Sequence, residues 1–295
     1  MIIVRLIGGL GNQMFQYAVA YVAAKNADTE LKVDNLYYRD HSKRMHRFMY
    51  RPYALSLLRI SATIATPRDI SRFVLPRIFN KYIYHFLRLF YRKHTNVFSE
   101  SELPSYKDLL ALPKDAYLYG FFQKYDYLKN NFDDIRREFT FKDLLPESFA
   151  PIVNNIQTTN DAICVSFRRG DYVGHPVLGI IDLPWYNRAL EVFKEGGHLF
   201  VFSDDIKWCI DNFRPHNRFT VTFVDQKYTG PMGGYYMQLM MLCEHFVIPN
   251  STYPYWAALL SKRSSNKVVV APKVWYKGQD ETIRNPILPD DWIAI

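Results

Sequence analysis

Short runs of apolar and β-branched residues alternate with segments of helical periodicity along most of the chain. In the first half, this pattern predicts strands at Ile2–Ile7, Leu31–Val33 and Tyr117–Phe122, and helices at Asn12–Ala27 and about Asp126–Glu138. In the second half, it predicts strands at Ile163–Arg168, His198–Ser203, Phe219–Val224, His245–Ile248 and Lys267–Ala271, with helices at about Trp185–Glu195, Ile206–Asn212, Tyr235–Leu242 and Tyr253–Ser261. Such alternation is typical of a parallel α/β fold and predicts two Rossmann-like domains facing a cleft.

The segment between the two halves has the composition of a linker. Leu144–Asp161 contains two prolines and the polar run Asn154–Asn160. We therefore expect an N-terminal domain at residues 1–150 and a C-terminal domain at residues 151–295.

Composition narrows the class of protein. Of the 295 residues, 48% are hydrophobic and 22% are charged, a balance that excludes a disordered chain. The three cysteines, Cys164, Cys209 and Cys243, form no paired set, which indicates a reducing compartment. The sequence has no run of about eighteen apolar residues, and Met1–Gly8 is too short for a signal peptide. We expect a cytoplasmic protein.

The positive charge is concentrated in one segment. The whole chain carries +8, but the stretch from Lys43 to His94 has twelve Lys or Arg and one acid, so the remainder carries −3. This asymmetry argues against a general nucleic-acid coat. Within the stretch, Tyr82–Lys93 predicts a basic amphipathic helix. Such a helix could lie on an anionic membrane surface, or its apolar face could pack on the first domain.

A glycine-rich turn follows the first predicted strand. Gly8-Gly9-Leu10-Gly11-Asn12-Gln13 opens the first helix, and glycines at this place let a ligand approach the backbone. Met14 occupies the third glycine position of a dinucleotide fingerprint, although Asp34 stands where a ribose-binding acid would be. Asn12 and Gln13 could bind a hydroxyl-rich ligand, or Asn12 could cap the helix.

A second motif ends the first strand of the second half. In Phe167-Arg168-Arg169-Gly170-Asp171-Tyr172, two arginines precede an acid at a strand end, where α/β sheets bind ligands. Because arginine pairs well with diphosphate oxygens and side chains alternate along a strand, we expect one arginine to face a ligand. The other would meet Asp171 or a core carboxylate. A purely structural ion pair is the alternative.

Polar residues also follow three later strands. Asp204 and Asp205 could bind a metal, act as a base or cap the next helix, and we favour a cap for one of them. A carboxylate at Asp225 could accept the two N–H donors of a guanine edge. Asn250-Ser251-Thr252 opens a helix whose N-terminus could bind a phosphate, cap the helix, or do both.

Five motifs, taken in order, resemble the bacterial α-1,2-fucosyltransferases of glycosyltransferase family 11. They are Gly8–Ala18, Gly120–Gln123, Arg168–Tyr172, Phe202–Asp205, and Leu239–Cys243 followed by Asn250–Thr252. The resemblance runs from Met1 to about Trp292 and is poor over residues 43–111, a basic helical insert. It implies a GT-B-like fold with an acceptor-side N-terminal domain, a GDP-sugar-binding C-terminal domain, and no metal or other cofactor.

The resemblance also implies roles for individual residues. Arg168 would be the catalytic, diphosphate-binding arginine, and Asp171 would be a donor-binding residue and a second catalytic candidate. The remaining donor-binding positions would be Tyr172, Asp225, Asn250, Ser251 and Thr252. Asn12 and Gln13 would lie in the cleft near the acceptor.

Three positions depart from the family pattern. Ser166 stands where histidine is usual, Tyr235–Gln238 lacks the common acid, and Ala257 replaces a glycine. Since serine cannot supply an imidazole to the nucleotide, we expect donor recognition to differ from the family norm. The donor sugar would then be L-fucose or a relative such as colitose. By this resemblance we expect an inverting, metal-independent transfer like that of a galactoside α-1,2-fucosyltransferase. It would move the sugar from a GDP-sugar to a hydroxyl of an oligosaccharide or lipid-linked glycan, forming an α-1,2 linkage in surface polysaccharide synthesis.

The residues by themselves leave the base and two rival functions open. Asp171 and Asp34 are the candidates for a base on the acceptor hydroxyl. One rival is a nicotinamide-dependent oxidoreductase, which the glycine-rich turn and Asp34 would suit. The other is a non-catalytic membrane-surface or nucleic-acid binder built on the basic segment. For the enzyme we expect peripheral contact with the inner face of an anionic membrane and no nucleic acid.

Overall fold

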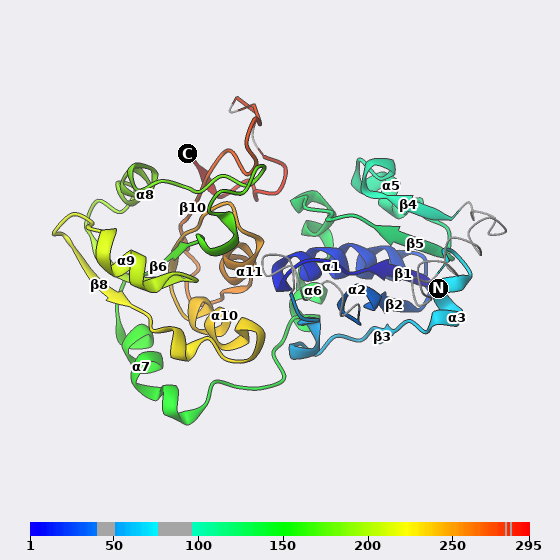
Figure 1. The fold of residues 1–295 in the computed structure, drawn as a ribbon, viewed down its shortest axis with the longest axis horizontal. Coiled ribbons are helices and arrows are strands. Elements are labelled where there is room, and N and C mark those ends of the chain that lie inside the picture. Colours follow the sequence, from blue (N-terminus) through cyan, green and yellow to red (C-terminus); the bar gives the residue numbers. More distant parts are fainter. Residues whose placement is uncertain (40–50, 76–95, 281, 284) are drawn as a thin grey trace. The chain divides into compact units, whose positions relative to one another are not determined.

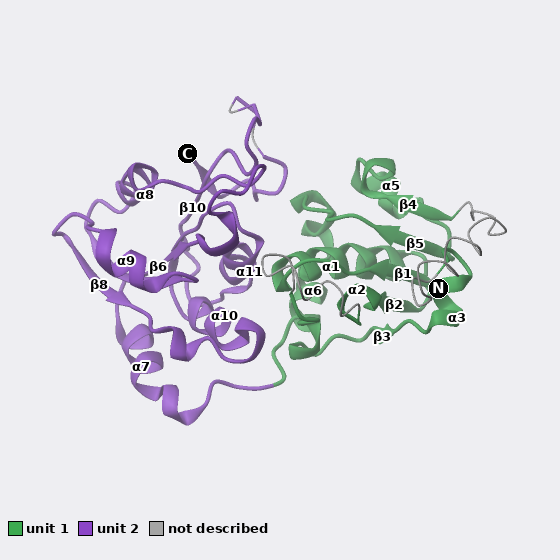
Figure 2. Ribbon diagram, in the orientation of Figure 1, with its two compact units in different colours: residues 1–142 green, residues 143–295 purple. Residues whose placement is uncertain are grey.

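The computed structural model describes residues 1–39, 51–75, 96–280, 282–283 and 285–295. The chain forms two compact units, residues 1–142 and residues 143–295 (Figure 2). The division therefore falls eight residues before the boundary expected from composition. The predicted amphipathic helix at Tyr82–Lys93 lies outside the described residues.

Unit 1 is built on a parallel sheet of five strands in the order β3-β2-β1-β5-β4. The strands are β1 (Ile2–Arg5), β2 (Leu31–Asp34), β3 (Thr63–Ile64), β4 (Val97–Ser99) and β5 (Ala116–Tyr119). β1 is central and buried, as its run of apolar residues requires. The two edge strands, β3 and β4, come from the stretch predicted as an insert, so that stretch completes the sheet.

The helices in the described part of unit 1 are mostly short. They are α1 (Leu10–Asn26), α2 (Leu36–Arg39), α3 (Pro67–Ser71), α5 (Tyr106–Leu110) and α6 (Phe132–Glu138), with 3₁₀ turns η2 (Leu55–Leu57), η3 (Glu100–Glu102), η4 (Tyr125–Tyr127) and η5 (Lys129–Asn131). The long helix α1 packs against β1 and is buried on nearly all sides (Figure 1). Most of its buried residues are apolar, which fits such a central position.

Unit 2 is built on a parallel sheet of six strands in the order β11-β10-β9-β6-β7-β8. The strands are β6 (Ala162–Phe167), β7 (Gly197–Ser203), β8 (Phe219–Phe223), β9 (His245–Val247), β10 (Val269–Ala271) and β11 (Ile293–Ala294). All six residues of β6 are buried, because neighbouring strands and helices cover it on every side.

Five α-helices accompany the sheet of unit 2 among the described residues. They are α7 (Ala150–Thr158), α8 (Leu183–Leu190), α9 (Ile206–Asn212), α10 (Gly234–Met241) and α11 (Thr252–Leu260), with 3₁₀ turns η6 (Glu147–Phe149), η7 (Gly170–Tyr172), η8 (Gln226–Tyr228) and η9 (Pro231–Gly233). The linker prediction for Leu144–Asp161 is wrong, since α7 fills half of that segment and buries Ile152 and Ile156.

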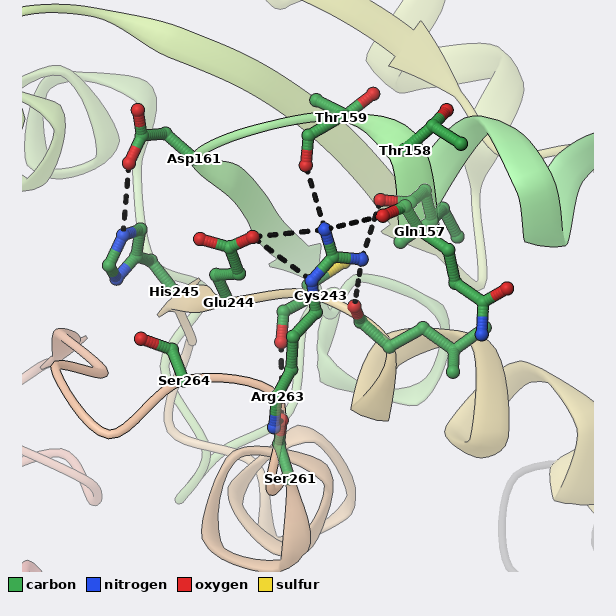
Figure 3. A network of polar contacts seen from close by, with 12 residues as sticks. Gln157, Thr158, Thr159, Asp161, Cys243, Glu244, His245, Ser261, Arg263 and Ser264 are labelled. Carbon is green, nitrogen blue, oxygen red and sulfur yellow. Dashed lines mark hydrogen bonds and ion pairs between the residues drawn. The ribbon is translucent and has the colours of Figure 1, made fainter.

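A largely buried arginine holds several elements of unit 2 together (Figure 3). The two terminal nitrogens of Arg263 donate to four backbone carbonyls at 2.7 to 2.9 Å, those of Ile156, Gln157, Thr159 and Leu242. Its Nε donates to the Glu244 carboxylate at 3.0 Å. The guanidinium thus satisfies carbonyls at the C-terminal ends of α7 and α10, which would otherwise lack donors.

The predicted α/β class, a GT-B-like pair of Rossmann-like units, is confirmed. The predicted strand at Tyr117–Phe122 ends early, because the backbone turns at Gly120 and Phe122, both of which have positive φ. No helix in the described ranges is long and apolar enough to cross a membrane.

Candidate functional site

The site predicted on unit 2 lies where the strand order of its sheet reverses. From β6 the chain builds outward through β7 and β8 on one side, and then returns to build β9, β10 and β11 on the other. β6 and β9 are therefore neighbours at the reversal point, and the loops after their carboxyl ends diverge there. Ligands of open α/β sheets bind at this place. Arg168 directly follows β6, and Asn250 lies three residues after the end of β9.

Arg168 is held between two carboxylates. Its Nη2 lies 2.5 Å from Oδ1 of Asp171, and its Nη1 lies 2.8 Å from Oδ2 of Asp204. The guanidinium also lies over the ring of Tyr172, 5.4 Å from its centroid. The Arg168 side chain is 25% exposed. A guanidinium has five N–H donors, so a pair of contacts of this kind orients the group without exhausting it.

Arg169 has a structural environment. Its guanidinium stacks on Trp208 at 3.6 Å from the ring and pairs with Asp205 through Nε at 3.2 Å. The Asp205 side chain also accepts from the Trp208 amide and caps α9, which confirms the predicted cap. The two arginines thus point to different partners, as expected for adjacent positions at a strand end, and it is Arg168 that meets Asp171.

Tyr172 connects the loop after β6 with the loop after β9. Its hydroxyl donates to the backbone carbonyl of Asn250 at 3.1 Å and lies beside the Ser251 hydroxyl. Burial raises the pKa of Tyr172 to about 12, although the nearby Arg168 guanidinium acts in the opposite direction. The phenol is therefore a neutral hydrogen-bond donor at any working pH.

The residues after β9 have two roles. Asn250 holds neighbouring loops in place, and Ser251 and Thr252 begin α11. Asn250 is buried, and its amide nitrogen donates to the carbonyls of Gly179 at 3.1 Å and Trp275 at 2.8 Å. Ser251 is the N-cap residue of α11 by position, but its side chain makes no capping bond. Thr252 is the first residue of that helix. The N–H groups in the first turn of a helix point outward along its axis and give this end of α11 a partial positive charge.

Asp225 lies apart from this group. It follows β8, which is separated from β6 by β7, and it is exposed. Its Oδ1 accepts from the Lys227 amide at 2.8 Å and caps the 3₁₀ turn η8. The structure thus brings Arg168, Asp171, Tyr172, Asn250, Ser251 and Thr252 together and leaves Asp225 at the far side of the same sheet edge.

In unit 1 the strand order reverses between β1 and β5, and Asn12 lies near this point. Helix α1 begins at Leu10 with Gly9 as its N-cap, so Asn12 is not the cap. Instead, its side-chain oxygen accepts a hydrogen bond from Gln123 at 3.0 Å, which links the loops after β1 and β5.

The prediction that Gln13 is exposed in the cleft near the acceptor is wrong. Gln13 is fully buried, and its amide nitrogen donates to the carbonyls of Gly8 and Pro52 at 3.0 and 2.9 Å. Its oxygen accepts from the amides of Ala54 and Leu55 at 2.8 and 3.2 Å. All of its hydrogen-bonding capacity is therefore used to fix the segment around Pro52 onto α1.

Asp34 is likewise structural. It is buried, and it accepts from the Tyr117 hydroxyl at 2.6 Å and the Leu36 amide at 2.9 Å. A carboxylate held in this way is removed both as a catalytic base and as a reader of ribose. The dinucleotide interpretation of the first turn therefore loses its acid.

One group among the described residues has the spacing of metal ligands: Asp161, Glu244 and His245 (Figure 3). Nδ1 of His245 accepts from the Val268 amide at 3.1 Å, so the neutral ring carries its proton on Nε2, which lies 3.7 Å from Asp161. Glu244 is already paired with the Arg263 cation at 2.9 Å. Because Glu244 and His245 already have polar partners, these groups suit a structural network of polar contacts better than a metal site.

Two functional contributors had only a faint signal in the sequence. Asp204, considered there as a cap, a base or a metal ligand, is a partner of Arg168 and also accepts from the Arg169 amide at 2.9 Å. Gly170 allows this contact, because a Cβ there would lie 2.6 Å from Oδ2 of Asp204. The only signal in the sequence was the Arg168-Arg169-Gly170 order, because Asp204 lies 35 residues after Arg169.

Comparisons with known proteins agree on one family. The profile of Glycosyl transferase family 11 matches residues 1–295. The O-antigen biosynthesis glycosyltransferase WbnK of Escherichia coli is 28% identical over 315 residues, covering 98% of this chain and 99% of the relative. An alpha-1,2-colitosyltransferase of Escherichia coli is 26% identical over 302 residues, covering 100% of this chain and 98% of that relative.

The fold has counterparts among solved structures. The fucosyltransferase NodZ from Bradyrhizobium matches with a TM-score of 0.51 and 12% sequence identity, covering 88% of this chain and 93% of that chain. At this identity the likeness concerns the fold alone.

Proposed function

The chain belongs to glycosyl transferase family 11, and from this premise we propose that it transfers L-fucose, or a related 6-deoxy sugar such as colitose, from a GDP donor to a glycan hydroxyl. The transfer would form an α-1,2 linkage in the synthesis of a surface polysaccharide. A curated relative named as an alpha-1,2-colitosyltransferase supports both the linkage and the wider choice of sugar. Ser166, where the family pattern has histidine, is consistent with a donor other than fucose.

The observation that carries this proposal is the position of Arg168 beside the start of α11. The guanidinium and the N-terminal N–H groups of the helix are both suited to diphosphate oxygens, and Tyr172 ties the two loops together. As the bond between the sugar and GDP breaks, negative charge grows on the departing diphosphate. A cation and a helix N-terminus fixed in advance would stabilise that charge.

The carboxylates around Arg168 set a condition on donor binding. Arg168 and Arg169 bring two positive charges, whereas Asp171, Asp204 and Asp205 bring three negative ones. A diphosphate would therefore bind on the exposed side of Arg168, away from the carboxylates. Asp171 and Asp204 would act by holding the planar guanidinium in one orientation, and lysine could not reproduce that geometry.

Transfer would proceed by a single displacement with inversion at the sugar carbon. Because Asp34 is buried and hydrogen-bonded, Asp171 remains as the carboxylate candidate for the base. Because Asp171 is ion-paired with Arg168, the reaction would rely mainly on the leaving group. We propose that no metal or other cofactor takes part, since Asp204 and Asp205 are each paired with an arginine.

We further propose a cytoplasmic enzyme that contacts the inner face of the membrane through its basic segment. The three cysteines among the described residues are buried free thiols, and burial raises the pKa of Cys164 well above its usual range. The charge of the Lys43–His94 stretch supports attraction to anionic lipid. Flotation with vesicles of increasing anionic content tests this, and absence of binding at low salt would contradict it.

The donor proposal is tested by offering the protein a panel of GDP-sugars with β-galactoside acceptors and detecting products by mass. Thermal stability is measured in parallel with GDP and with NADH. We expect GDP to raise the melting temperature and NADH to leave it unchanged. Stabilisation by NADH alone would favour the oxidoreductase and contradict the proposal.

A further inference from the structure

A hollow of about 490 Å³ lies at the carboxyl edge of the unit 1 sheet. It is lined by Ser99–Ser101 after β4, by Tyr119 and Gly120 at the end of β5, and by Pro104 and Lys124. This is the sheet edge at which α/β proteins bind ligands, and the hollow lies beside β5, one of the two strands at which the order of this sheet reverses.

The walls of the hollow combine an exposed ring with charged hydrogen-bonding groups. Tyr119 is 41% exposed, so part of its ring is accessible to a ligand. Glu100 brings a carboxylate whose Oε2 accepts from the Phe121 amide at 2.8 Å. The Lys124 ammonium donates to the Pro104 carbonyl at 2.7 Å, which uses one of its three donors.

The contact between the two strand ends requires a glycine. Gly120 has φ of +153°, and a Cβ there would lie 2.6 Å from Cβ of Glu100. Its carbonyl accepts from the buried Gln16 at 2.9 Å, which fixes the end of β5 to α1. The position of Glu100 in the wall of the hollow is therefore set by the backbone at the end of β5. The shape of the hollow is thus fixed by the fold of unit 1.

We propose that this hollow binds a sugar ring of the acceptor glycan, an inference that rests on the proposed glycosyl transfer. Sugars present an apolar face of C–H groups edged by hydroxyls. The exposed Tyr119 ring would stack on that face, while the Glu100 carboxylate accepts from hydroxyls and Lys124 donates to them. This chemistry suits a neutral saccharide and assigns acceptor recognition to residues outside the glycine-rich turn.

The test uses the full-length protein and two β-galactosides, lactose and N-acetyllactosamine, as probes. Binding is measured by saturation-transfer NMR titration for the wild type, Tyr119→Ala and Glu100→Gln. Ile64→Ala is the matched control, because Ile64 is 43% exposed on β3 at the opposite edge of the same sheet. Glutamine keeps an oxygen for the Phe121 amide, so this variant removes the charge and retains that contact.

We expect the saccharide Kd to rise roughly tenfold in Tyr119→Ala and several-fold in Glu100→Gln, with the control unchanged. Stabilisation by GDP should be the same in all four proteins. Absence of saccharide binding in the wild type, or equal binding in all four proteins, would overturn the inference. Saccharide binding that depends on Tyr119, without any stabilisation by GDP, would support this subsite and overturn the proposed donor.

Discussion

The hydroxyl of Tyr172 donates to the backbone carbonyl of Asn250 at 3.1 Å, across 78 residues of sequence. The same ring lies under the guanidinium of Arg168, at 5.4 Å. One phenol therefore holds the loop after β6 against the loop after β9, at the point where a diphosphate would bind. The rigidity of this arrangement depends on a side chain that remains protonated.

Stability should fall in alkaline solution, partly through Tyr172. Its pKa is about 12 in the folded protein and about 10 in an unfolded chain, because burial disfavours the charged form. The stabilising contribution is complete below pH of about 10 and is lost as the pH rises toward 12, since the unfolded chain releases the proton first.

Urea denaturation at pH 8 and pH 11 measures this loss. Tyr172→Phe removes one titrating group, so its unfolding free energy should fall less between the two pH values, by on the order of 1 kcal/mol. An equal fall in both proteins would contradict the assignment.

Removing the Arg168 side chain should abolish most transfer. Loss of a charged contact to the departing diphosphate typically costs about 2–4 kcal/mol of transition-state stabilisation, or roughly two to three decades in rate. Arg168→Lys should recover only part of the activity, because it lacks the planar fork. Arg188→Ala, on the exposed face of α8, is the control and should behave as wild type. Near-normal kinetics in Arg168→Ala would refute the role of this motif.

A methyl group at Gly170 should disturb the site through Asp204. A Cβ there would lie 2.6 Å from Oδ2 of Asp204 and would push that carboxylate away from Arg168. We expect Gly170→Ala to lower kcat/KM by roughly tenfold while the melting temperature changes little. In Gly179→Ala the added Cβ meets its nearest neighbour at 3.7 Å, an ordinary contact, so activity should be retained. Equal activity in the two variants would show that Asp204 does not orient Arg168.

Loss of the Arg263 side chain should destabilise unit 2. Arg263→Ala leaves four backbone carbonyls without their donor and the Glu244 carboxylate without its cation, which should cost about 3 kcal/mol or more (Figure 3). Arg263→Lys should recover only part of this, since one ammonium cannot reach all the carbonyls. The neighbouring Lys262 is exposed, and Lys262→Ala should leave the unfolding free energy within about 0.5 kcal/mol. A small effect of Arg263→Ala would show that solvent replaces these contacts.

Transfer should survive chelation of divalent ions. The Asp204 and Asp205 carboxylates are paired with arginines, and His245 presents a protonated Nε2 toward Asp161. We expect activity in EDTA to stay within about twofold of the untreated enzyme. A loss that magnesium or manganese restores would contradict a metal-independent mechanism.

Local pattern was sufficient to predict the central strands of both sheets. β6 and β7 are long apolar runs, and their burial on both faces of a parallel sheet is what such runs indicate. The edge strands β3 and β4 escaped prediction because they have two and three residues, too few for a periodic signal. Helix α7 was predicted as a linker because its proline and its amides outweighed the two apolar residues that pack inward.

The sequence by itself determined the α/β class, the family, and the strand ends that carry Arg168 and Ser251, because these depend on short motifs and local periodicity. Only the tertiary structure decided which polar side chains face a ligand. Gln13 and Asp34 have the residue types of a binding site, yet both are buried and are hydrogen-bonded to partners 39 and 83 residues away. Hydrogen-bond partners brought in by distant segments leave no trace in local pattern, and burial of a polar group is settled only when those partners arrive.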